Sequence, residues 1–118
     1  MSMRERVERV LKNEGTAVQR LGEAGTSITF TVAGGTQEPV TLLLDRVPPQ
    51  LAAGTDSEIT VELDAERAQR FMRGELVLST CLIEGGATAR GPIRKYLVVD
   101  PILRRLLAVV EAQHVVTP

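Results

Sequence analysis

Three segments of the chain alternate apolar and polar residues with a period of two, and this pattern restricts the fold more than any other feature of the sequence. They cover residues 28–32, 40–44 and 59–63, where Ile, Val, Leu and Phe alternate mostly with Thr and Glu. Alternation of this kind is typical of strands with one face buried and the other face in water. A sheet with a single apolar face must be covered by a second layer, so we expect helices packed against it.

Amphipathic segments around these strands can supply that layer. Apolar residues recur at helical spacing over residues 3–21, and Gly15 is a position where this helix can break or bend. Asp64 has the character of an N-cap, and the helix that follows it ends at Gly74. The mixed stretch 75–84 is expected to contain a short helical turn.

The C-terminal part carries more apolar surface than one sheet face needs. A fourth strand is expected at 87–90, followed by a helical piece from about residue 93 and a second one that starts at Asp100-Pro101. The inward side chains of the strand are the small Ala87 and Ala89, which face long side chains on the last helix. Small residues opposite long ones either interdigitate or leave an apolar cavity. The long residues of this helix are Ile102, Leu103, Leu106, Leu107, Val109 and Val110.

The charge balance and the composition exclude several classes of partner. The 118 residues include 14 Lys and Arg against 15 Asp and Glu, a net charge of −1, so no general attraction toward DNA is expected. Phe occurs twice, Tyr once and Trp not at all, which argues against a base-stacking surface for single-stranded nucleic acid. The charged N-terminal segment and the lack of a long apolar run predict a cytoplasmic protein without stable membrane insertion.

Residues that usually carry catalysis or bind metals are scarce. Cys81 is the single cysteine, so no intrachain disulfide is expected, and a small buried hydrophobe is its favoured role. His114 is the single histidine, and its spacing from Cys81 gives no sign of a nucleophile pair. The acids are spread singly, and the paired glycines lack the lysine and the spacing of a phosphate loop. We predict no catalytic residue, no metal and no cofactor.

The segment 59–107 combines these features in a characteristic order. A helix starts after Asp64 and carries the apolar pair Phe71-Met72 near its end. Glycines follow at separations of 11 and 6 residues: Gly74, Gly85 and Gly91. This arrangement resembles the central and C-terminal part of the sterol carrier protein type 2 lipid-transfer family. The resemblance implies a five-stranded sheet covered by helices, an apolar tunnel for sterols, fatty acids or acyl chains, and no catalysis.

Pattern and resemblance together predict a single α+β domain over residues 1–118. It would have a mainly antiparallel five-stranded sheet and an apolar cavity beneath the C-terminal helices. Its predicted function is non-catalytic binding or carriage of a hydrophobic small molecule, by a monomer or homodimer. Tyr96 either offers the ligand an oriented hydrogen bond or lies at the boundary with its hydroxyl in water. The predicted ligand-binding residues are Phe71, Leu82, Ala87, Ala89, Tyr96, Leu97, Ile102, Leu103, Leu106, Leu107 and Val110.

Two other classes of function fit the same sequence. One is an accessory or cyclase-like enzyme that acts on a bound polyketide or terpenoid, with Tyr96, Arg94 or Cys81 polarising the ligand. The other is an interaction module that dimerises through its apolar C-terminal helix.

Overall fold

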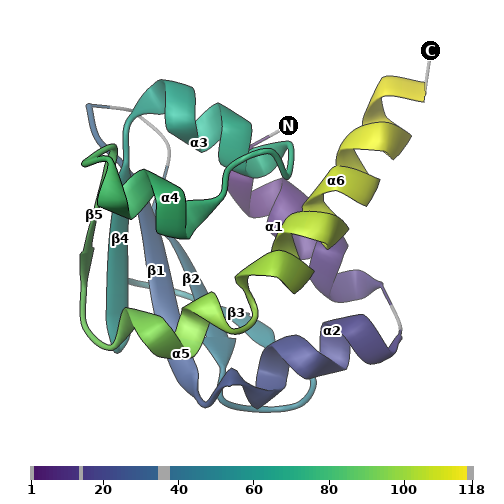
Figure 1. The fold of residues 1–118 in the computed structure, drawn as a ribbon. Coiled ribbons are helices and arrows are strands. Elements are labelled where there is room, and N and C mark those ends of the chain that lie inside the picture. The colour runs from purple at the N-terminus through teal and green to yellow at the C-terminus, as the bar shows by residue number, and fades with distance from the viewer. Residues whose placement is uncertain (1, 14, 35–37, 117–118) are drawn as a thin grey trace.

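A computed structural model describes residues 2–13, 15–34 and 38–116, with side chains as far as residue 113 (Figure 1). The side chain of His114 lies outside these described residues. In chain order the elements are α1 (Met3–Lys12), α2 (Thr16–Leu21), the 3₁₀ turn η1 (Gly22–Ala24), β1 (Thr26–Val32), β2 (Val40–Leu44), β3 (Gln50–Ala52), β4 (Ile59–Leu63), α3 (Ala65–Met72), α4 (Leu78–Ile83), β5 (Ala87–Arg90), α5 (Ile93–Leu97) and α6 (Asp100–Val116).

The described residues form one five-stranded sheet in the order β3-β2-β1-β4-β5. The expectation of a mainly antiparallel sheet is wrong, because β1 and β4 at its centre run parallel and make the sheet mixed. The physical reason is that β1 belongs to an antiparallel pair with β2 and β4 to another with β5. The two pairs meet side by side at a parallel seam, where Phe30 lies opposite Val61.

The alternation of the strands separates two faces, as the sequence pattern predicts. The inward residues of β1 and β4, which include Phe30 and Val61, are almost completely buried. Figure 1 shows helices, among them α3, α4 and α5, packed against one face of this sheet. On the other face Thr60 and Glu62 are exposed, but Thr29 and Thr41 are buried there. Their hydroxyls are 2.7 Å apart, and Thr41 also donates to the Gly54 carbonyl at 2.8 Å, so the loop after β3 covers this part of the face.

The helices begin and end where the local sequence indicates. The Asp64 carboxylate accepts from the Arg67 amide at 2.7 Å, which confirms Asp64 as the N-cap of α3. The chain breaks between α1 and α2, where Gly15 has a φ of +149°. The helical turn expected within 75–84 is α4. Over the described residues, the helices are too short or too polar to cross a membrane.

The last helix, α6, contacts both α1 and the segment just after α3. Gly74, just after α3, approaches α6 so closely that an ideal Cβ would lie 2.4 Å from the Arg104 carbonyl oxygen. The Arg6 guanidinium of α1 forms an ion pair with Glu111 of α6 and donates to the Met72 carbonyl at 3.4 Å. These contacts join α1, α3 and α6 over the sheet.

Candidate functional site

The three aromatic residues of the chain meet between the sheet and its helical cover. Phe30 of β1 lies with its ring centroid 4.6 Å from that of Phe71 on α3, in a tilted arrangement. The Tyr96 ring on α5 packs edge-on against Phe30 at 5.6 Å. Aromatic pairs in these geometries are more stabilising than their buried area alone implies. They mark the centre of the interior.

The buried face of α6 forms one wall of this interior. Asp100, Leu103, Leu107 and Val110 follow one another at steps of 3, 4 and 3 residues, which places them on one side of the helix. Their exposed fractions are 5%, 1%, 0% and 0%. Of these four residues only Asp100 is polar, so the stripe begins with an acid and is otherwise apolar.

That acid is bonded to the single tyrosine. The Tyr96 hydroxyl donates to Asp100 Oδ1 at 2.7 Å, and Tyr96 itself is completely buried. The expectation that this hydroxyl lies at the boundary in water is therefore wrong, because one helical turn brings Asp100 to it. Asp100 is the first residue of α6, where this helix was expected to start, and its side chain accepts the hydrogen bond from Tyr96.

Burial changes the acid–base properties of both groups. Loss of solvation raises the pKa of Asp100, and the Tyr96 hydroxyl, the Arg104 charge and the Leu78 backbone amide oppose this rise. The pKa of Tyr96 is raised well above its usual value, first by burial and then by the charge and hydrogen bond of Asp100. The tyrosine is therefore a stable donor to Asp100.

The structure brings all the predicted ligand-binding residues into one cluster with the core of the sheet. Those that are buried are Phe71, Ala87, Tyr96, Leu103, Leu107 and Val110. Those that are partly buried and pack against the cluster are Leu82, Ala89, Leu97, Ile102 and Leu106.

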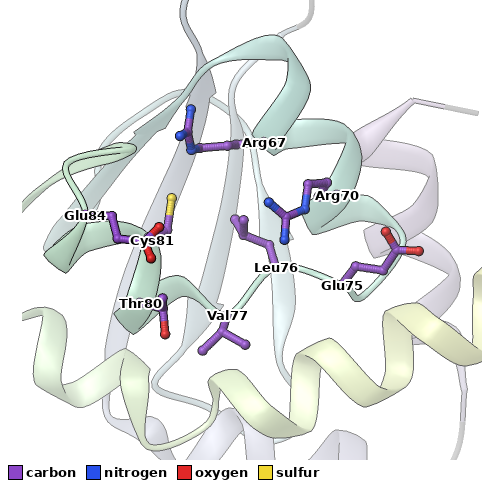
Figure 2. A pocket seen from close by; sticks show the side chains of 8 residues that line it. All are labelled: Arg67, Arg70, Glu75, Leu76, Val77, Thr80, Cys81 and Glu84. Atoms are coloured by element: carbon purple, nitrogen blue, oxygen red, sulfur yellow. The ribbon is translucent and has the colours of Figure 1, made fainter.

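Hollows lined by described residues lie outside that cluster of predicted residues. One of about 160 Å³ lies between α3 and α4 (Figure 2). Figure 2 shows Arg67 and Arg70 of α3 on one side, with Thr80 and Cys81 of α4 and the following residue Glu84 on the other. Further hollows lie on the outer face of the sheet, beside Thr60, and along α1, beside Leu11.

The hollow between α3 and α4 was not foreseen from the sequence. Its floor includes Leu76 and Cys81, which belong to the core cluster, so the expected burial of Cys81 is confirmed. Charges of both signs surround it, and Arg67 is already paired with Asp64. Arg67 and Arg70, one helical turn apart on α3, were a possible sequence signal for this hollow. Arginines interleaved with acids are equally typical of any solvent-exposed helix face, so the signal did not identify a site. Among the described residues, no three His, Cys, Asp or Glu side chains converge as metal ligands would.

Comparison with solved structures identifies the fold. Sterol carrier protein 2 from Yarrowia lipolytica, in its apo form, superposes with a TM-score of 0.65 at 18% identity, over 87% of this chain and 88% of that one. The sterol carrier protein domain 2 of Helicoverpa armigera gives 0.61 at 14% identity, over 91% and 85%. The fold is that of sterol carrier protein 2. No protein-family model and no curated protein matches the sequence.

A third structure with the sterol carrier protein 2 fold is a UbiJ-SCP2 ubiquinone synthesis protein. It gives a TM-score of 0.55 at 17% identity, over 93% of this chain and 88% of that one. The sequence resemblance is thus confirmed at the level of the fold. The glycines that carried it end α3 at Gly74 and flank β5 at Gly85 and Gly91.

Proposed function

We propose that this protein binds or carries a hydrophobic small molecule, such as a sterol, a fatty acid or another acyl chain, without catalysing a reaction. The observation that carries the proposal is the sterol carrier protein 2 fold, in which a helical layer covers the apolar face of a mixed sheet. The apolar stripe of α6 supports it, because Leu103, Leu107 and Val110 are buried in the same core cluster as Phe30 and Phe71.

The proposed site lies between the sheet and α6. Its residues are Phe71, Leu82, Ala87, Ala89, Tyr96, Leu97, Ile102, Leu103, Leu106, Leu107 and Val110. These side chains belong to the core cluster or pack against it, so a bound ligand is expected to displace some of them. The partly buried members, such as Leu106 and Leu97, are the ones that can move outward with the smallest loss of core contacts. Affinity would come chiefly from apolar burial, at about 25 cal/mol per Å².

The proposal places the protein in the cytoplasm, as a monomer or homodimer whose partner is the hydrophobic ligand and not a nucleic acid. A role in biosynthesis is the second candidate, because one structural neighbour bears the description of a ubiquinone synthesis protein. In that case the chain would present a bound hydrophobic intermediate, and Tyr96, Arg94 or Cys81 would be the groups to test for an effect on turnover.

A fluorescent acyl-chain probe is expected to bind saturably at micromolar concentration and to raise the melting temperature. Binding only to the folded state at 100 times Kd adds about 2.7 kcal/mol, or roughly 10 °C for a domain of this size. Leu106→Gln, in the proposed site, should weaken binding. The matched control Ile83→Gln, at a side chain that is 87% exposed on α4, should not. No saturable binding together with an unchanged melting curve would refute the proposal.

A further inference from the structure

The described residues place one buried carboxylate inside the proposed site. Among the described acids only Asp100 is buried, and it begins the stripe that continues with Leu103, Leu107 and Val110. A carboxylate removed from water is unfavourable unless hydrogen bonds satisfy it. Here the Tyr96 hydroxyl donates to Oδ1 at 2.7 Å, and the Leu78 amide at the start of α4 also favours the charged form.

When Asp100 is ionised, the pair that it forms with Tyr96 can accept further hydrogen bonds but has none to donate. The single hydroxyl proton of Tyr96 is already used on Asp100. An ionised carboxylate has about four acceptor positions and no proton, and a phenolic oxygen can accept as well as donate. A ligand group that carries its own O–H can therefore bond to the pair, whereas an ester, a ketone or a carboxylate cannot.

The charges near the pair leave little attraction for a second carboxylate, because the cation that acts on Asp100 is already balanced by that carboxylate. Arg104, one turn further along α6, is the cation that acts on Asp100. The Arg6 guanidinium lies near the other end of the helix, beside Glu111, which is 111 − 100 = 11 residues or roughly 16 Å away along the axis. Arg6 is bonded there to Glu111 and to the Met72 carbonyl. A ligand carboxylate next to Asp100 would meet a like charge in a poorly solvated interior, which is strongly unfavourable.

We propose that Asp100, bonded to Tyr96, is the head-group acceptor of the lipid site and that its carboxylate selects neutral lipids with a hydroxyl group over fatty acids and their esters. The hydroxyl would donate to Asp100, and the hydrocarbon part would lie along Leu103, Leu107 and Val110. This inference rests on the proposed function and specifies its ligand class.

Competition against a neutral fluorescent hydrocarbon, diphenylhexatriene, tests the selectivity. Hexadecanol, palmitate and methyl palmitate share one chain length and differ in the head group. Hexadecanol is expected to displace the probe at a concentration at least about tenfold lower than either of the others. Asp100→Asn should reduce that ratio to less than about threefold, because an amide also donates to carboxylate and ester oxygens.

Two further variants separate recognition from folding. Tyr96→Phe removes the hydroxyl but keeps the carboxylate, so it should fold and retain the preference for hexadecanol. The exposed control Glu75→Gln should leave all three affinities unchanged. Equal affinities for the three lipids, a preference for palmitate, or a Tyr96→Phe protein without preference would overturn the inference while leaving the proposed function intact. If neither the probe nor any of the three lipids binds, the proposed function fails as well.

Discussion

Replacing Gly74 by alanine is expected to lower the free energy of unfolding by about 2–5 kcal/mol, from a left-handed backbone and an overpacked helix contact. Gly74 has a φ of +75°. The added Cβ would lie 2.4 Å from the Arg104 carbonyl oxygen and 2.7 Å from the Ala108 backbone nitrogen. These atoms belong to the backbone of α6, so the whole helix must shift. Because α6 buries Leu103, Leu107 and Val110 in the core cluster, the variant should also bind a hydrophobic dye more strongly.

Gly85→Ala is the matched control for this experiment. Gly85 has a φ of +80°, and an ideal Cβ on it has no described heavy atom within 4 Å. Its free energy of unfolding should fall by only about 1–2 kcal/mol, the cost of a left-handed backbone for a residue with a Cβ. Urea unfolding of both variants measures the difference. Equal losses in the two proteins would contradict the close approach of Gly74 to α6.

Glu111→Leu is expected to destabilise the protein by about 3 kcal/mol, the lower end of the usual loss when one partner of a buried ion pair is removed. The side chains of Arg6 and Glu111 are 10% and 23% exposed. Removing Glu111 leaves the less exposed charge, Arg6, without this partner. Its Nε already has no hydrogen-bond partner among the described residues, so solvation cannot readily replace the pair.

The double variant Arg6→Met/Glu111→Leu should recover most of that loss. Methionine keeps the apolar stem of Arg6, and apolar replacements of a buried pair are often neutral or stabilising. A double-mutant cycle by urea unfolding gives the coupling directly. If the double variant is as unstable as Glu111→Leu, the ion pair is not what holds α6 to α1.

The elements that could be predicted are those with a strong local pattern. The alternation at 28–32, 40–44 and 59–63 marks strands because one face must be buried. Asp64 begins α3 because its carboxylate accepts an orphan amide of the first turn. The short strand β3 has only three residues and no alternation, so it forms through its pairing of Leu51 with Leu42 and not through its own pattern.

Features that depend on contacts between distant residues could not be predicted. Alternation does not tell whether two strands run parallel, and the seam between β1 and β4 follows from how two antiparallel pairs meet. The ion pair of Arg6 and Glu111 joins residues 105 positions apart. The hydrogen bond of Tyr96 to Asp100 is different, because their spacing of four residues was visible. The Asp-Pro sequence indicated only the start of a helix, and the bond to Tyr96 became evident from the burial of both side chains.

NMR on methyl-labelled protein with a long-chain lipid shows directly whether the lipid lies between the sheet and α6. Intermolecular NOEs are expected from the lipid methylene protons to the methyl groups of Leu103 and Leu107, which are 1% and 0% exposed. The methyl groups of Ile83, exposed on α4, should show none. NOEs confined to exposed methyl groups such as those of Ile83, or no change in the spectrum at saturating lipid, would contradict this placement of the lipid.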